Sequence, residues 1–175
     1  MSETQGYHFY WNGPFSQWQI SQFTLWGIDF NTAEQAMMVG KARLFGDEST
    51  AAEIMAAEDP GKQKALGRKV HGFDEDVWDA NKVGLVKQIN FAKFDQNKGL
   101  RRKLFQTIPM LMVEASPMDT IWGIGLDEAN ARQTPTENWP GQNLLGRIVT
   151  EVRNELAVKF PEEAKACAPT MGEEH

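Results

Sequence analysis

The sequence predicts a mainly α-helical fold with a small β component, arranged as one compact domain. In residues 75–97 and again in residues 141–160, apolar side chains recur with the spacing of one helix face. Short aromatic segments near the N-terminus are broken by glycine, proline and asparagine, as strands joined by turns are. With 175 residues the chain can hold a core and a pocket, and we place the domain at residues 1–160, before a polar tail at 161–175 that we expect to be disordered.

The β component is expected in three short segments. Residues 7–11 and 23–30 are rich in aromatic and β-branched side chains, and Gly27 interrupts the second of them. Residues 110–115 form an apolar run next to prolines, which is typical of a buried strand.

The helices are expected to begin at residues that cap exposed backbone amides. Thr32 or Asn31 precedes the first helix and places Glu34 in its first turn, where a carboxylate suits the positive end of the helix dipole. Asp74 or Glu75 begins the longest helix. In chain order, the predicted helices span residues 31–45, 47–57, 59–70, 74–97, 100–106 and 141–160.

Composition narrows the function classes. The formal net charge is −6, from 18 Lys and Arg against 24 Asp and Glu, whereas sequence-independent nucleic-acid binders carry a basic excess. The single cysteine, Cys167, excludes an internal disulfide framework and favours a reducing cytoplasm. No apolar run reaches the length of a membrane span, and the first residues lack the basic and apolar regions of a signal peptide. We therefore expect a soluble cytoplasmic protein with no membrane partner.

Several well-known catalytic motifs are absent from the sequence. It contains no GxxxxGK[ST], no GxGxxG after a strand, no HExxH and no GxSxG, and His8 and His71 are isolated. We therefore expect no metal site, no cofactor and no serine or cysteine triad.

The most informative residue is Lys41. On a helical wheel of residues 31–45, Lys41 falls on the apolar stripe that also holds Glu34, two turns or roughly 10 Å away and too far to pair as a helix neighbour. Apolar surroundings penalise an ammonium and lower its pKa, which makes a neutral amine nucleophile available near neutral pH. The wheel places Met37, Met38, Leu44 and Phe45 beside the stripe and points Gln35, Val39 and Arg43 elsewhere.

Two interpretations of this helix are open. In one, Lys41 extends its alkyl stem from the core edge to water, and Glu34 only serves the helix dipole. In the other, the amine and the carboxylate line one wall of a pocket and face the same ligand.

A second candidate site follows the strand predicted at residues 110–115. Asp119 and Trp122 supply an acid and an indole there, and Gly123 and Gly125 let the backbone come close to a ligand. The alternative is an ordinary turn, in which Asp119 bonds local amides and Trp122 fills the core.

Three weaker candidates complete the set. Phe15 and Ser16 lie in an aromatic turn. Asn143 stands where the last helix begins, and free amides at that end would hold a phosphate unless Asn143 simply caps the helix. Lys93 would add a cation to the cavity that holds such a phosphate, or else it would be solvated.

Taken in chain order, these segments resemble the YbiA-like family, also called NADAR. The resemblance spans residues 9–156 and rests on GPFSQW, TAEQAMMVGKA, Trp78, NFAKFDQN, LMVEASPMDTIWGIG and GQNLLG followed by Arg153. It implies a mostly helical fold with a little β structure, and an N-glycosidase that cuts the bond between a ribose carbon and a nitrogen. Two substrate types are associated with the family: phosphorylated ribosylamine intermediates of riboflavin biosynthesis, and ADP-ribose attached to guanine.

The resemblance also implies residue roles. The family's site lysine and helix acid match Lys41 and Glu34, and its loop acid and indole match Asp119 and Trp122. In ADP-ribosyl members the lysine is thought to form a Schiff base with an opened ribose, which requires an uncharged amine. The expected catalytic residues are thus Lys41, Glu34 and Asp119, and the expected substrate-binding residues are Phe15, Ser16, Trp78, Lys93, Trp122, Gly125 and Asn143.

This chain departs from the common family pattern at two places. Many members read FSN and EHY where it has Gln17 after Ser16, and Gln35 with Ala36 after Glu34. The identity of the substrate is therefore not fixed: it is a nucleotide-like small molecule or ADP-ribosylated nucleic acid. We expect no obligate protein partner. A module that binds ADP-ribose without cleaving it is the alternative, although binding alone does not need a desolvated amine.

Overall fold

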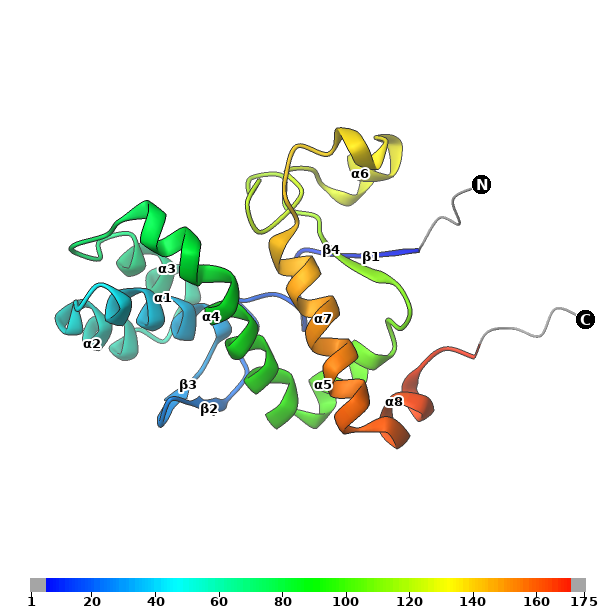
Figure 1. Ribbon diagram of the computed structural model, residues 1–175, viewed down its shortest axis with the longest axis horizontal. Coiled ribbons are helices and arrows are strands. Elements are labelled where there is room, and N and C mark those ends of the chain that lie inside the picture. Colours follow the sequence, from blue (N-terminus) through cyan, green and yellow to red (C-terminus); the bar gives the residue numbers. More distant parts are fainter. Residues whose placement is uncertain (1–5, 171–175) are drawn as a thin grey trace, which may run out of the picture. The chain divides into compact units, whose positions relative to one another are not determined.

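The computed structural model describes residues 6–170, and these form two compact units (Figure 1). One unit is continuous and consists of Ser16–Asn97. The other combines the chain up to Phe15 with the chain from Lys98 onward. Helices dominate both units, so the predicted mainly α-helical class with a small β component is confirmed.

The continuous unit begins with a hairpin. Strands β2 (Phe23–Leu25) and β3 (Ile28–Phe30) pair antiparallel. Trp26 and Gly27 make the turn between them, and both have positive φ, of 55° and 71°, in agreement with the interruption expected at Gly27. Four helices follow, α1 (Ala33–Leu44), α2 (Glu48–Ala56), α3 (Pro60–Gly67) and α4 (Glu75–Gln96).

Side-chain caps fix where these helices begin. The Thr32 hydroxyl accepts the amide of Gln35 at the start of α1, so Thr32 rather than Asn31 is the cap. Aspartates cap the other three helices: Asp47 for α2, Asp59 for α3 and Asp74 for α4. Each accepts the backbone amide three residues further on, and Asp59 and Asp74 lie where the sequence placed the starts of α3 and α4.

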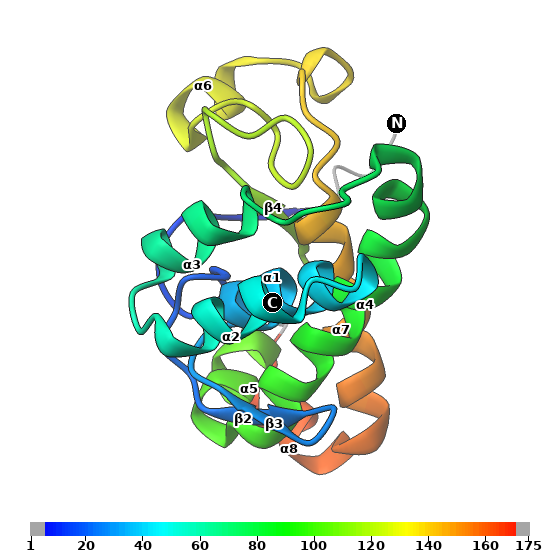
Figure 2. The ribbon, with the colours of Figure 1, turned by 90° about the vertical axis from the view of Figure 1, so that its left-hand side faces the viewer.

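Helix α1 is the centre of this unit. It packs against α2, α3 and α4, and Figure 2 shows these helices around it. The prediction of a single apolar stripe is therefore wrong: Gln35 and Val39, expected to point elsewhere, are buried, whereas Leu44, expected on the stripe, is exposed. A helix surrounded on several sides buries nearly its whole circumference. Burial continues along α1 up to Ala42, with Lys41 only partly covered.

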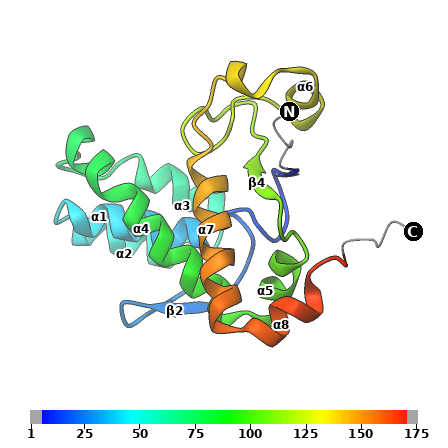
Figure 3. The same cartoon turned by 45° about the vertical axis from the view of Figure 1, so that its right-hand side comes forward.

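The discontinuous unit joins the two ends of the chain. Strands β1 (Tyr7–Tyr10) and β4 (Leu111–Glu114) pair in parallel, and α7 packs on β4 (Figure 3). The remaining elements of the unit are α5 (Lys98–Phe105), α6 (Glu128–Gln133), a 3₁₀ turn at Thr136–Asn138, α7 (Leu144–Lys159) and α8 (Pro161–Cys167).

The expectation of a disordered C-terminal tail is wrong for residues 161–167. Residues 161–167 were expected to be disordered but form α8, which packs on α5 and α7. The helix buries Ala164, and Glu163 forms an ion pair with Arg101 of α5. Residues 171–175, which the same expectation covers, lie outside the described residues. The short helices between residues 127 and 139 were not predicted, because six residues are too few for a clear helical period.

Two negative findings concern residues 6–170. No helix there is both long and apolar enough to cross a membrane. In the same part of the chain, no three His, Cys, Asp or Glu side chains are grouped in a way that would hold a metal ion.

Candidate active site

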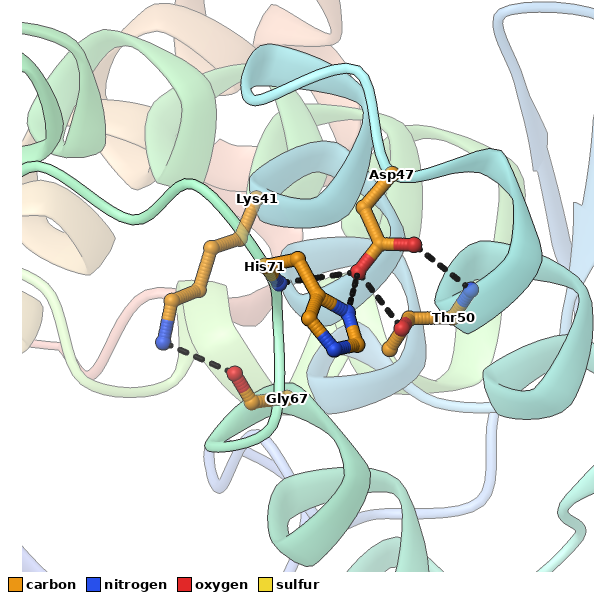
Figure 4. Close-up of polar contacts among 5 residues, drawn as sticks. All are labelled: Lys41, Asp47, Thr50, Gly67 and His71. Carbon is orange, nitrogen blue, oxygen red and sulfur yellow. Dashed lines mark hydrogen bonds and ion pairs between the residues drawn. The ribbon is translucent and has the colours of Figure 1, made fainter.

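Lys41 lies on the third turn of α1, with its amine held among groups from α3, α4 and the loop between them. The ammonium donates a hydrogen bond to the carbonyl of Gly67 at 2.9 Å (Figure 4). It also lies 4.6 Å from the centre of the Phe73 ring and 5.9 Å from that of Trp78. The amine thus has one polar partner and two aromatic neighbours.

These surroundings favour the neutral amine. Partial burial lowers the pKa of Lys41, Glu34 opposes that shift, and the nearby positive charge of Arg68 adds to it. The net effect is a pKa below the ordinary value for lysine. A larger fraction of Lys41 is therefore unprotonated near neutral pH than of an ordinary surface lysine, as a nucleophilic amine requires.

Gly67 allows the close approach that brings its carbonyl to Lys41. A Cβ at this position would overlap the Met38 side chain, because α3 ends directly against α1. The carbonyl of Gly67 also belongs to the last turn of α3, whose partial negative charge attracts a cation. A glycine at the end of α3 therefore sets the position of the Lys41 amine.

Glu34 lies in the first turn of α1, which is buried from Ala33 onward. The residue is 5% exposed, and its backbone amide donates to the carbonyl of Gln17 at 3.0 Å. The next residue, Gln35, has a structural role: its amide group donates to carbonyls of Ile54, Met55 and Ala57 at the end of α2. Gln35, which stands where the resembled family pattern has histidine, thus links the end of α2 to α1.

Ser16, Gln17 and Lys93 are linked through the backbone that precedes β2. Lys93 is fully buried and donates to the carbonyl of Ser16 at 2.8 Å, and this burial lowers its pKa to about 7. The Ser16 hydroxyl accepts the amide of Trp18. The side-chain amide of Gln17 is buried, and neither of its polar atoms has a hydrogen-bond partner among the described residues. Lys93 therefore holds the segment whose next carbonyl receives the Glu34 amide.

The loop between α3 and α4, residues 68–74, carries Phe73 and is tied to the start of α2. The backbone amide and ring Nδ1 of His71 lie 2.9 and 3.1 Å from one carboxylate oxygen of Asp47 (Figure 4). The same carboxylate accepts the amide and hydroxyl of Thr50. Hydrogen bonds from Thr50 and His71 hold the pKa of Asp47 far below its usual range, so Asp47 stays ionised. One carboxylate thus fixes both α2 and this loop.

In the discontinuous unit, Asp119 shapes the loop after β4. One of its carboxylate oxygens accepts the backbone amides of Ile121 and Trp122, each at 2.9 Å. This is the local-amide interpretation of Asp119. Gly123 is tightly enclosed by backbone of the same loop, since a Cβ there would lie 3.0 Å from the carbonyls of Asp119 and Glu114.

Of the two interpretations left open for the start of α7, the one in which free amides hold a phosphate is wrong. The backbone amides of residues 141–145 donate in turn to the carbonyls of Ile124, Thr120, Gly123, Ile121 and Trp122. The two segments lie so close that Gly141 and Gly125 are required: a Cβ at Gly141 would overlap the backbone of residues 123–124, and Gly125 has a φ of 74°. These amides are therefore unavailable to a phosphate.

Asn143 and Phe15 also have structural partners. Asn143 has a φ of 54° and makes no cap with its side chain. Its side-chain oxygen accepts the amide of Glu114, and its nitrogen donates to the carbonyl of Met112, so it joins β4 to α7. Phe15 is buried and packs edge-on against Tyr10 and His8.

The two units thus divide the predicted site residues evenly. The continuous unit holds Ser16, Glu34, Lys41, Trp78 and Lys93, and the discontinuous unit holds Phe15, Asp119, Trp122, Gly125 and Asn143. Within the continuous unit, Lys41 meets Trp78 directly and interacts electrostatically with Glu34.

Comparison with known proteins gives this arrangement its context. The sequence model of the NADAR domain matches residues 7–157. The chain belongs to the NADAR family. It is 43% identical to "N-glycosidase R617" of Acanthamoeba polyphaga mimivirus, an alignment that covers 81% of this chain and 86% of that protein. "N-glycosidase YbiA" of Escherichia coli is 28% identical, over 80% of this chain and 82% of that protein.

The NADAR fold is also seen in a solved structure. The NMR structure of Escherichia coli YbiA superposes with a TM-score of 0.73 at 24% identity, over 98% of this chain and 92% of that one. "Riboflavin biosynthesis protein PYRR, chloroplastic" of Zea mays is 30% identical over 65% of this chain, a match to 17% of that longer protein. With N-glycosidase relatives aligned along most of its length, this NADAR chain is an enzyme of the N-glycosidase class.

Two neighbours of Lys41 in this NADAR chain, Phe73 and Gly67, were not predicted from the sequence. Phe73 follows Gly72 in a loop, and an aromatic residue beside a glycine in a loop is the signal that singled out Trp122 beside Gly123. Gly67 gave no signal, because its role depends on a contact between two helices that are not neighbours in sequence.

Proposed function

We propose that this enzyme hydrolyses the bond between ribose C1 and the nitrogen of a base, with Lys41 as the nucleophile. The observation that carries the proposal is the Lys41 amine, held by one carbonyl between two aromatic rings with its pKa lowered by burial. A neutral amine attacks an electrophilic carbon, whereas an ammonium does not.

The reaction we propose has three stages: opening of the ribose ring, replacement of the base by Lys41, and hydrolysis of the resulting imine. In the first stage the bond from C1 to the ring oxygen breaks, that oxygen takes a proton, and the base nitrogen forms a double bond to C1, which makes C1 electrophilic. Lys41 Nζ then forms a bond to C1, the bond from C1 to the base breaks, and the departing base nitrogen takes a proton. The product of this stage is an imine between Lys41 and the sugar. Water adds to the imine carbon, the C1–Nζ bond breaks, and the sugar leaves as its aldehyde while the free amine returns.

Glu34 and Asp119 are the carboxylates proposed to transfer the protons. Glu34 is supported by its burial on the same helix and by its electrostatic effect on Lys41. For Asp119 the support is the family motif, and its remaining carboxylate oxygen would carry the proton, because the other accepts two backbone amides. Glu34→Gln and Asp119→Asn assign the two roles separately: a variant that loses both base release and imine formation identifies a carboxylate needed before the base leaves, whereas a variant that releases one base and retains the imine identifies the carboxylate that assists its hydrolysis.

The binding roles proposed from the family motif are those of Trp78 and Trp122 as walls for the base, and of Phe15, Ser16, Lys93, Gly125 and Asn143 as neighbours of the sugar or phosphate. Trp78 has the strongest support, because its ring lies beside the Lys41 amine. Ser16, Lys93 and Asn143 have backbone partners of their own, and each of them holds the backbone of its own unit.

The proposed substrate classes are a phosphorylated ribosylaminopyrimidine and guanine-linked ADP-ribose. The similarity to PYRR of Zea mays, named for riboflavin biosynthesis, supports the first. The second follows from the family resemblance, in the free form or on nucleic acid. Both present a ribose C1 bonded to a nitrogen of a flat heterocycle, which is the bond that the Lys41 mechanism addresses.

The test compares release of free base from each substrate by the wild type and by Lys41→Ala. We expect loss of turnover with an unchanged circular dichroism spectrum, and borohydride added during turnover should attach the mass of the reduced sugar to Lys41. Lys69→Ala, which removes an exposed lysine from the nearby loop, is the matched control and should keep wild-type activity. Substantial base release by Lys41→Ala would exclude the imine mechanism. Tight binding of either compound without base release would instead indicate a sensor.

A further inference from the structure

Phe73 stands out among the residues that no motif includes. It is an aromatic side chain with 45% of its surface exposed, so it does not simply fill the core. Its ring centre lies 4.6 Å from the Lys41 amine and packs edge-on against Phe45 at 5.4 Å. The ring is therefore both accessible and supported.

The geometry of attack by Lys41 indicates which part of the substrate would lie beside the Phe73 ring. An attacking amine approaches its carbon to about 3 to 3.5 Å before bond formation. The base nitrogen is one single bond, roughly 1.5 Å, beyond that carbon. The base therefore begins within about 5 Å of the amine, which is also the range in which the Phe73 ring lies. A flat heterocycle in that position gains by stacking or edge contact with an aromatic ring.

Hydrogen bonds to the start of α2 hold the loop that carries Phe73. His71, two residues earlier, gives its backbone amide and places its ring nitrogen at the carboxylate of Asp47. Asp47 is itself fixed by Thr50 at the start of α2. Between His71 and Phe73 lies Gly72, with a φ of 75°, which lets the chain turn so that Phe73 faces α1.

We infer that Phe73 contacts the base of the substrate and determines specificity for an aromatic leaving group, and that the Asp47–His71 contact positions it. Phe73 is thus a substrate-contacting residue, whereas His71 and Asp47 are positioning residues that act through it. This inference rests on the proposed function, because it places the base by reference to the Lys41 nucleophile.

The main test separates the base from the sugar. For Phe73→Leu, which keeps a hydrocarbon beside Lys41, we expect KM for the base-bearing substrate to rise about ten-fold, and we expect Phe73→Trp to keep the wild-type value. Ribose 5-phosphate carries no base, so its borohydride-trapped adduct at Lys41 should form equally in the wild type and in Phe73→Leu. Trp26→Leu, which removes a similarly exposed ring from the β2–β3 turn, is the control and should leave KM unchanged.

His71 is tested by a split between KM and kcat. His71→Ala keeps the backbone bond to Asp47 but loses the ring contact, and should raise KM less than Phe73→Leu does while leaving kcat unchanged. His71→Asn, which restores a donor toward Asp47, should recover the wild-type KM. Lys69→Ala in the same loop is the control.

The outcomes distinguish this inference from the proposed function. Wild-type KM in Phe73→Leu, or an equal loss of ribose 5-phosphate trapping, would overturn the role of Phe73 toward the base. A change in kcat alone for His71→Ala would overturn the positioning role. Absence of base release by the wild-type enzyme from either substrate would contradict the proposed function itself.

Discussion

At the scale of single residues, two lysines of one unit are held in opposite ways. Lys41 is partly exposed, and its amine can reach a ligand by leaving the carbonyl of Gly67. Lys93 is fully buried on a single carbonyl, that of Ser16. Both pKa values are lowered by burial, but only Lys41 combines a lowered pKa with exposure. Exposure, rather than pKa alone, therefore favours Lys41 over Lys93 as the proposed nucleophile.

Lys93 gives a prediction about stability and pH. Its pKa in the folded protein is about 7, below the ordinary 10.5, so between these values the unfolded chain binds a proton that the folded chain lacks. Stability therefore rises as the pH rises through this window, by up to about 1.4 kcal/mol per pH unit. Lys93→Met removes this contribution, and urea unfolding from pH 7 to 9.5 should show a shallower rise than in the wild type. Exposed Lys69→Met should keep the wild-type slope, and an equal slope in Lys93→Met would show that Lys93 is protonated when buried.

At the scale of elements, the contact between α3 and α1 links packing to the site. The last residue of α3 must be glycine for the helix to reach α1, and the carbonyl of that glycine holds the Lys41 amine. Packing of two helices thus sets the position of a reactive group.

Gly67→Ala tests this link. The added methyl group meets Met38, and the strain should cost about 1 to 3 kcal/mol of unfolding free energy. Because the carbonyl moves with the helix, borohydride trapping at Lys41 should fall as well. In the double variant with Met38→Ala, the methyl group has room, so the two costs should be less than additive by chemical denaturation. Strict additivity would show that the two positions are not in contact.

The elements that could be predicted from the sequence are those that local signals define. Capping aspartates and long helical periods located α3, α4 and α7 to within a few residues. The burial of Gln35 and Val39 could not be predicted, because it depends on how many neighbours surround α1. The partners of the amides at the start of α7 could not be predicted either, because only the fold brings residues 120–124 to them.

The candidate site was predictable to the same extent. Lys41 and Glu34 stood out because charges on a buried helix are rare. Phe73 and Gly67 were missed because their significance lies in distances to Lys41 across a loop and a second helix. For Asp119 the sequence left two interpretations open, and the bonds to Ile121 and Trp122 agree with the local one.

At the scale of the whole molecule, the discontinuous unit is closed by its last helix. Arg101 of α5 and Glu163 of α8 make two parallel hydrogen bonds, at 2.9 and 3.2 Å, with both side chains largely buried. Arg101 also lies over the ring of Phe160. Residues 161–167 are therefore part of the folded protein.

Glu163→Gln should lower the thermal midpoint, because it leaves a buried guanidinium with a weaker acceptor, at a cost of about 1 to 3 kcal/mol. Arg101 lowers the pKa of Glu163, so the stabilising effect is present above the ordinary carboxyl pKa and is lost as the pH falls through the folded value. The difference in midpoint between variant and wild type should therefore shrink in acid. Glu162→Gln, on the exposed neighbouring side chain, is the control. An unchanged midpoint for Glu163→Gln would show that this ion pair contributes nothing to stability.

The parallel pairing of Tyr7 with Leu111 has a consequence for synthesis on the ribosome. The chain of Ser16–Asn97 emerges between the two strands, so that unit is complete before β4 exists. At about 5 to 20 residues per second, β1 waits several seconds with its hydrogen-bonding edge open. Strand β1 therefore stays unpaired while the continuous unit is synthesised, and slowed translation after residue 97 would lengthen this interval.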